Sequence, residues 1–264
     1  MVVVDKSDVK IITTKNYQSS IKKRGLNSII IHREHVYDES KLEIDIHGAY
    51  WSLGIFYFPI HAGALRLGEE TINLIGKKIL FIPPFSVLHW LIKPSKLSWT
   101  YLIVKEKMNK KTFTVPKLFD ENTLNMEVCD LYDLDSDAIL SLIEAKYKCG
   151  QSLAWPVKNC SEKVKYAIDS CFAENLQLKT ILFSVNPSLS YLSRQFSKDY
   201  GLSPIQYRQR LRLMQASVDC MFNRKSVESI HLDLGFDDSS YFYQSFRDYL
   251  HTSPSEFRKV SKCF

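Results

Sequence analysis

The sequence predicts a two-domain α+β protein, with a β-barrel in the N-terminal half and an all-helical domain in the C-terminal half. Between residues 28 and 105, short β-rich runs alternate with turn residues, which is typical of an antiparallel barrel or sandwich. From residue 161 onward, apolar residues recur with a helical period. Within this helical part, one block of sequence is repeated at an offset of 50 residues.

The β-rich runs divide the first half into short strands. The runs are 28–31, 53–58, 63–68, 71–75, 79–82 and 97–104. Gly68, Gly76 and the pair Pro83-Pro84 separate several of them, as expected for turns. We therefore assign residues 1–125 to a barrel-like domain.

Residues 126–159 are expected to form a helical segment and a linker. Apolar residues between positions 134 and 148 have a helical spacing, and Gly150 and Pro156 then end the pattern. A helical segment between two domains could contribute to a homodimer. The all-helical domain then covers residues 160–264.

The repeat defines two small helical units. Ser190-Tyr191-Leu192 recurs as Ser240-Tyr241-Phe242, and Ser203-Pro204 recurs as Ser253-Pro254, with no gap between the copies. Two copies are too few for a solenoid, which needs at least three stacked units. Duplex DNA repeats with a fixed pitch, so two equivalent units on one body suggest double-stranded DNA as the partner.

A long helix is expected to join the two units. Ser203 is a suitable N-cap and Pro204 suits the first helical position, so this helix should run from there to about Phe222. Its apolar stripe is expected at Tyr207, Leu211, Met214, Val218 and Met221. Eighteen residues give a rod of roughly 27 Å.

Other helix ends follow from local chemistry. Gly201 and Gly235 are expected to terminate helices, and Ser226 and either Asp237 or Asp238 are expected to cap the helices that follow.

Polar and cationic side chains on the outer sides of these helices are the candidate DNA contacts. They are Ser190, Ser193, Arg194, Lys198, Arg208 and Arg212 in the first unit, and Ser239, Ser240, Tyr243, Gln244 and Arg247 in the second. Residues 188–212 hold five arginines or lysines against one aspartate, whereas residues 237–250 hold one arginine against three aspartates. The first of the two helical repeats should therefore provide most of the attraction for phosphate. For any single arginine, a solvated helix face is an equally good interpretation.

The second unit is similar to a known family signature. Gly235 to Phe242, then Phe246-Arg247, then Ser253 to Arg258 resemble the second helix-turn-helix of AraC/XylS-family transcription regulators. The resemblance covers roughly residues 160–262 and implies two recognition helices in successive major grooves, joined by a linker helix. It implies that Ser190, Ser193 and Arg194, and then Ser239, Ser240 and Tyr243, contact base edges.

Several positions depart from the family pattern. Gln244 and Asp248 stand where the family usually has basic residues, and His251 replaces a glycine after the second recognition helix. Leu182 and His231 replace small alanines where helices cross.

The N-terminal half resembles, less strongly, the cupin-like sensor domain of the same family. Tyr57, His61, His89 and Trp90 are candidates for lining a ligand pocket. His61 and His89 could approach each other, but no His-x-His pair is present, so we expect structural histidines, no metal and no cofactor.

These features predict a cytoplasmic bacterial DNA-binding transcription regulator. The chain opens without a recognisable signal peptide and has no run of 18 apolar residues, so no membrane span is expected. We expect an activator that binds promoter DNA and recruits RNA polymerase, controlled by a small molecule or a regulatory protein. No nucleotide-binding or nucleophile motif occurs, so no catalytic residue is assigned. The alternatives are a cupin-type enzyme with a degenerate helical domain, or a regulator controlled only by a protein partner.

Overall fold

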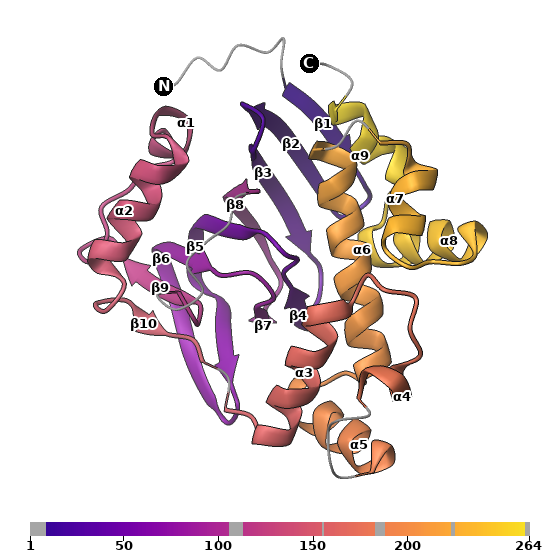
Figure 1. Ribbon diagram of the computed structural model, residues 1–264. Helices are drawn as coiled ribbons and strands as arrows, with labels where there is room; N and C mark the ends of the chain where they lie inside the picture. Colours follow the sequence, from indigo (N-terminus) through magenta and orange to yellow (C-terminus); the bar gives the residue numbers. More distant parts are fainter. Residues whose placement is uncertain (1–8, 106–112, 155, 183–187, 223–224, 262–264) are drawn as a thin grey trace. The chain divides into compact units, whose positions relative to one another are not determined.

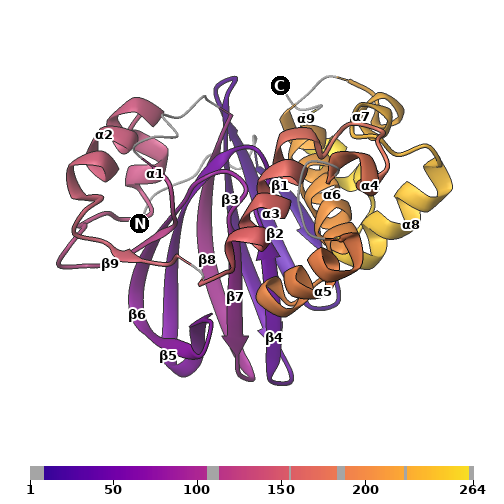
Figure 2. The same ribbon diagram turned by 60° about the horizontal axis from the view of Figure 1, so that its bottom comes forward.

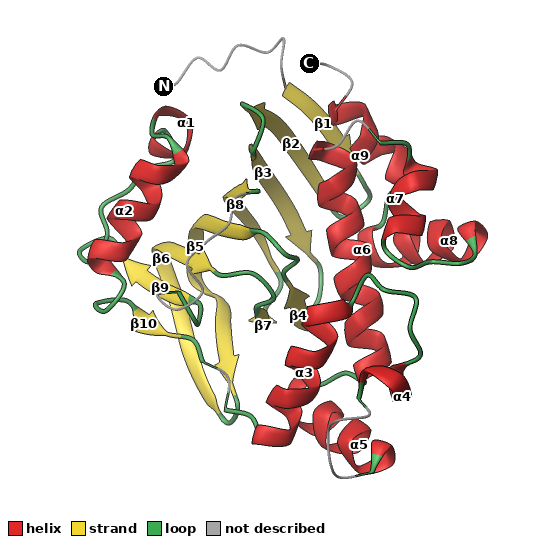
Figure 3. Cartoon of the chain, in the orientation of Figure 1, coloured by secondary structure: helices red, strands yellow, loops and turns green. Residues whose placement is uncertain are grey.

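The computed structural model describes residues 9–105, 113–154, 156–182, 188–222 and 225–261. The chain divides into two compact units, whose principal segments are Met1–Ala154 and Trp155–Arg258 (Figure 1). Strands occur in the first unit, and the second is built of helices (Figure 3). The α+β class with a β-rich first part and a helical second part is therefore confirmed.

The first unit contains one antiparallel sheet. Its strands are β1 (Val9–Thr13), β2 (Tyr17–Arg24), β3 (Ser28–Tyr37), β4 (Lys41–Ile46), β5 (Trp51–Leu67), β6 (Glu70–Ile82), β7 (Val87–Ile92), β8 (Ser95–Val104), β9 (Lys117–Asp120) and β10 (Gln151–Ser152). They follow the path β1-β2-β3-β8-β5-β6-β9-β10, and β4 joins through β7 to β5. Over the described residues, β1 and β10 end this path without pairing to each other, so the sheet is an open version of the expected barrel.

Strand β5 corrects the expected strand boundaries. The runs predicted separately at 53–58 and 63–68 form one strand, because the chain continues through an irregularity in register between Phe58 and Gly63. Before this irregularity β5 pairs with β8, and after it β5 pairs with β7. A bulge bends a strand and increases its twist. Because β5 changes partner at this bend, the sheet curves there and does not continue flat.

The two faces of β5 contribute to two separate cores, since side chains alternate along a strand. Leu53 and Ile55 pack with side chains of α1 (Asp130–Asp133) and α2 (Ser136–Lys146), which lie along one face of the sheet (Figure 2). Phe56 and Phe58 enter the other core, where Phe56 lies 5.5 Å from Trp90 between ring centroids. Helix α2 lies within the predicted helical segment.

The second unit consists of seven helices over the described residues. They are α3 (Asn159–Cys171), α4 (Leu178–Ile181), α5 (Leu189–Tyr200), α6 (Pro204–Phe222), α7 (Val227–Asp233), α8 (Ser239–Leu250) and α9 (Pro254–Ser261). Helix α6 contacts α3 and α5 of the first repeat and α7 and α8 of the second. Helix α5 lies at the start of α6, where Phe196 packs on Tyr207, and α8 lies beside α6, where Gln209 Nε2 donates to Ser245 Oγ at 3.1 Å (Figure 1).

Helix α6 confirms the expected linker helix but is more deeply buried than one apolar stripe predicts. Tyr207 and Leu211 are fully buried, whereas Met214 is only half-buried. Leu213 and Ala216, off the predicted stripe, are also buried. Helices of both repeats pack against α6, so more than one side of it is covered.

Several helix ends match the local chemistry of the sequence. Ser226 accepts a hydrogen bond from the Ser229 N–H at 3.0 Å, and Asp238 accepts one from the Tyr241 N–H at 2.9 Å. Gly201 ends α5 in the left-handed region. No helix in the described part of the chain is both long and apolar enough to cross a membrane.

Phe81→Ala tests the helix-covered core. The Phe81 ring is fully buried, 6.0 Å from Trp51 and 5.1 Å from Phe113 between centroids. We expect the variant to lower the free energy of unfolding of the first unit by about 3–5 kcal/mol, measured by urea denaturation. Ile60→Ala is the control, because Ile60 is 72% exposed and its loss should change stability by less than about 0.5 kcal/mol. Similar losses in both variants would contradict this account of the core.

Candidate nucleic-acid interface

Helices α5 and α8 are structurally equivalent across the 50-residue repeat. Both contain 12 residues. Each is followed by a left-handed residue, Gly201 with φ 73° and His251 with φ 57°. The N–H groups of these two residues donate to Ser197 and Arg247 carbonyl oxygens at 2.9 and 2.8 Å. His251 therefore takes the position where the sequence pattern would place a glycine, at some conformational cost.

The repeat also reproduces the inward packing of the two helices. Leu192 and Phe196 of α5 are buried, as are Phe242 and Phe246 of α8. The Phe196 ring lies 5.6 Å from that of Tyr207, and the Phe246 ring lies 5.7 Å from that of Phe257. Tyr207 and Phe257 are themselves separated by the repeat offset. The two helices are thus held by the same aromatic contact.

Nine of the eleven candidate DNA contacts lie on these two helices. Ser190, Arg194, Lys198, Ser239, Ser240, Gln244 and Arg247 are exposed, and Ser193 and Tyr243 are half-buried. Tyr191, also exposed, lies under the Arg194 guanidinium at 6.0 Å from its ring centroid. The sequence reasoning did not select Tyr191, although its place one turn before the arginine was a usable signal.

The two remaining candidates, Arg208 and Arg212, use their donors inside the helical unit. Arg212 donates from Nε to the Phe172 carbonyl at 2.6 Å, from Nη2 to Glu174 at 2.7 Å and from Nη1 to Gly235 at 2.8 Å. Arg208 donates to the Leu176 carbonyl at 2.6 Å and also to Phe172 and Glu174. Burial, followed by the neighbouring Arg208, lowers the pKa of Arg212 to about 10.

These two arginines connect the repeats. Phe172 and Glu174 follow α3, ahead of the first repeat, and Gly235 follows α7 in the second. Carbonyl groups at helix ends lack intrahelical partners, and the guanidinium supplies them with charge-assisted hydrogen bonds. We call Arg208, Arg212 and their carbonyl partners the arginine clamp. The clamp ties the C-terminal ends of α3 and α7 to the same side of α6.

The exposed charge differs between α5 and α8. On α5, the Asp199 carboxylate accepts hydrogen bonds from Ser161 Oγ at 2.6 Å and from Gln195 Nε2 at 2.7 Å, so it is used in docking α5 onto α3. On α8, Gln244 Nε2 donates to Asp248 Oδ1 at 2.8 Å, and both residues are exposed. The outer side of α5 therefore carries Arg194 and Lys198, while a carboxylate lies beside the corresponding side of α8.

The four ligand-pocket candidates of the first unit do not form one site. Tyr57 is exposed, and its hydroxyl donates to Glu127 at 3.4 Å. His89 is buried, and burial, followed by Arg66, lowers its pKa to about 4. Trp90 is buried in the aromatic core. His61 alone of the four lines a surface hollow.

No three His, Cys, Asp or Glu side chains gather as a metal site within the described residues. The expectation that the protein binds no metal and no cofactor stays a prediction.

Comparisons with known proteins match this geometry. The model of a helix-turn-helix domain family matches residues 184–260, which include both equivalent helices. The arabinose operon regulatory protein of Escherichia coli K12 is 31% identical over 109 residues, 41% of this chain and 37% of that protein. The transcriptional activator RhaS of an Enterobacter species is 35% identical over 92 residues, 35% of this chain and 33% of that protein.

The C-terminal unit is an AraC-type helix-turn-helix domain. The AraC-type resemblance of the sequence is thereby confirmed for this unit. The chain covers only about a third of the length of the arabinose regulator and of RhaS. These two matches do not extend to the remainder of either protein.

Two further similarities extend beyond the AraC-type domain. The Msm operon regulatory protein of Streptococcus mutans is 25% identical over 225 residues, 75% of this chain and 80% of that protein. Fatty acid-bound ToxT of Vibrio cholerae matches 90% of this chain and 97% of its own, with a TM-score of 0.51 and 12% identity. The ToxT likeness supports the two-part fold.

Gly235→Ala tests the arginine clamp. Gly235 has φ +74°, and an added Cβ would lie 2.5 Å from the Ala173 carbonyl oxygen and 2.6 Å from Arg212 Nη2. We expect the free energy of unfolding of the helical unit to fall by more than the roughly 1–2 kcal/mol that a left-handed alanine costs by itself.

Gly76→Ala is the matched control for the first unit, since Gly76 has φ +70° and open space around its Cβ position. The free energy of unfolding lost in Gly76→Ala, measured by the same urea denaturation, should not exceed the roughly 1–2 kcal/mol that a left-handed alanine costs. Equal losses of stability in Gly235→Ala and Gly76→Ala would contradict the prediction, because the Arg212 side chain could then be displaced without cost.

Proposed function

We propose that the protein is a sequence-specific DNA-binding transcription regulator that places α5 and α8 in successive major grooves of promoter DNA. The observation that carries the proposal is the structural equivalence of these two helices, both of which pack against α6. Helix α6 has 19 residues, or about 28 Å at 1.5 Å per residue. Successive major grooves on one face of B-DNA lie about 34 Å apart, which is the spacing that α5 and α8 must span in this proposal.

Exposed side chains on the two helices supply suitable chemistry for this contact. Arginine pairs in a bidentate manner with guanine, and serine and glutamine also bond base edges. Arg194 and Ser190 of α5 and Ser240 and Gln244 of α8 are the exposed groups of these types. Lys198 and Arg247 are suited to phosphate. We assign Arg208 and Arg212 to holding the two helical repeats in register, and not to direct contact with DNA.

The proposal includes activation through recruitment of RNA polymerase, control by a small molecule or a partner protein at the first unit, and no catalysis. Named activators among the similar proteins support the first part. The fatty acid bound to ToxT supports the second. Pairing of two copies through the first unit is compatible with this scheme. Genomic footprinting of the full chain is the experiment that identifies its sites, and an absence of enriched sites would refute the function.

Arg194→Ala tests direct base contact. The side chain is exposed on the outer side of α5. We expect its removal to weaken binding to the specific site by about 1–3 kcal/mol while affecting random DNA much less, measured by titration of the full chain with labelled duplexes. Lys163→Ala is the control for lost charge, because Lys163 is exposed on α3, outside both proposed recognition helices. An equal loss on specific and random DNA would reduce Arg194 to a phosphate contact.

A change at Gln244 and Asp248 tests the weaker charge of the second helix. Gln244→Arg alone would place the new cation beside Asp248, the present partner of Gln244. We therefore expect the double variant Gln244→Arg/Asp248→Asn to bind more tightly, with a salt dependence steeper by about one to two phosphate contacts. Asp248→Asn alone is the matched control. Weaker binding of the double variant at low salt would indicate that Gln244 itself contacts a base.

A further inference from the structure

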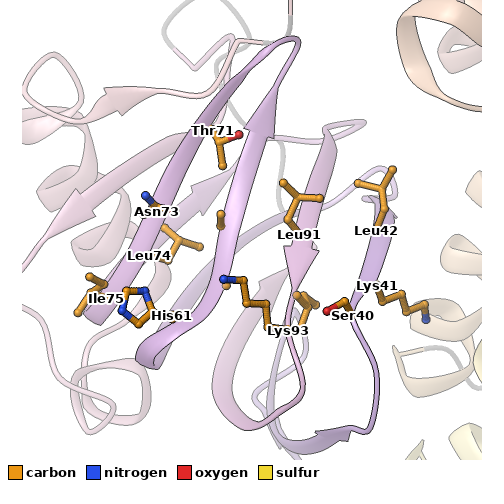
Figure 4. A pocket seen from close by; sticks show the side chains of 13 residues that line it. Ser40, Lys41, Leu42, His61, Thr71, Asn73, Leu74, Ile75, Leu91 and Lys93 are labelled. Carbon is orange, nitrogen blue, oxygen red and sulfur yellow. The ribbon is translucent and has the colours of Figure 1, made fainter.

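The first unit has a surface hollow of about 420 Å³ over strands β4, β5, β6 and β7 (Figure 4). Its lining is mainly apolar, and its volume lies within the range of roughly 300–1,000 Å³ found for small-molecule sites. All of its lining residues belong to the first unit, so the hollow is complete without the helical unit.

The floor of the hollow is a row of side chains that crosses four strands. Leu42 pairs with Leu91, Leu91 with Ala64, and Ala64 with Asn73. Paired residues of adjacent strands point to the same face of a sheet. The small side chain of Ala64 leaves space between its larger neighbours in the row. Leu42 remains 47% exposed, so apolar surface is presented to solvent in this row.

Positively charged or basic side chains occupy one end of this apolar floor. His61 and Lys93 lie along the lower part of the hollow in Figure 4, whereas the Lys41 side chain points away from them; all three are exposed. Lys41 lies 3.7 Å from Glu43, an exposed pair that water screens. Arg66 lies in the next row toward Thr71, at the opposite end of the floor, where it pairs with His89 and Thr71. No acidic residue belongs to the lining.

The backbone at this end has an unusual conformation. His61 has φ 64°, in the left-handed region, within the irregular part of β5 between Phe58 and Gly63. Non-glycine residues in this region cost about 1–3 kcal/mol and cluster at ligand sites. The irregularity places His61 beside the hollow, which provides an observation independent of its volume and charge.

We propose that this hollow binds an amphipathic anion, with the apolar body on the Leu42–Asn73 row and the carboxylate at the Lys93 and His61 end. An apolar floor with Lys93 and His61 at one end and no lining carboxylate complements an apolar chain that ends in one negative charge. The inference rests on the proposed function in one respect: in a DNA-binding regulator, a ligand in the hollow would change the affinity for DNA. It makes the hollow the effector site and assigns no ligand contact to Tyr57, His89 or Trp90.

Isothermal titration of the full chain with three ten-carbon probes tests the chemistry of the site. Decanoate, decanol and decyltrimethylammonium share an apolar chain and differ in charge. We expect decanoate to bind about fivefold more tightly than decanol, as an exposed ion pair allows, and the cation to bind most weakly. Equal affinities for all three probes would overturn the proposal, because apolar adsorption alone would then explain the binding.

Two variants locate the binding. Asn73→Trp fills the hollow from an exposed position on β6, and we expect it to abolish decanoate binding. Lys93→Gln keeps the strand intact and should lower decanoate affinity to that of decanol. Lys96→Gln is the control, because Lys96 is a surface lysine paired with Glu34 at 2.7 Å and does not line the hollow. Unchanged decanoate affinity in both Asn73→Trp and Lys93→Gln would overturn the assignment.

Two further outcomes separate this inference from the proposed function. Decanoate binding at the hollow with an unchanged DNA dissociation constant would refute its role as effector site and leave DNA binding intact. Sedimentation of a dimer that dissociates in Asn73→Trp, without decanoate binding, would assign the hollow to a second copy of the chain and overturn the small-molecule proposal.

Discussion

The helical unit depends on how α6 is held between the two repeats. The aromatic contacts of Phe196 and Phe246 seat one recognition helix in each repeat. The Arg212 guanidinium then links carbonyl groups that follow α3 and α7, on the same side of α6. Helix-end carbonyls that are buried without a partner would be costly, so this link satisfies the backbone while fixing the position of one repeat relative to the other. The separation of α5 and α8 follows from this arrangement.

In the first unit, the bend in β5 has a comparable role. It lets one strand pair with β8 before the bend and with β7 after it. The sheet consequently presents one face to α1 and α2, and encloses an aromatic core with the other. His61 lies in the bend, and its left-handed backbone brings the ring beside the hollow. One local irregularity thus shapes both the core and the surface of the unit.

The helical unit was predictable because its signals are local. Helix periodicity, the caps at Ser226 and Asp238 and the left-handed stop at Gly201 each involve residues within a few positions of one another. The exposed positions on α5 and α8 followed from the same periodicity.

What the sequence did not reveal depends on long-range contacts. The clamp joins Arg208 and Arg212 to carbonyls 23 to 40 residues away, and a count of charges cannot assign a partner at that distance. The single strand β5 was missed because a histidine in the left-handed region leaves no compositional signal. Strand β7 (Val87–Ile92) was also missed, although its apolar run resembles the run at 79–82 that was assigned to a strand.

The most direct test of two recognition helices on one rigid body is a hydroxyl-radical footprint of the full chain on its own operator. The account predicts two protected segments on one face of the duplex, centred about 10 base pairs apart. A single protected segment, or two segments on opposite faces of the DNA, would contradict it.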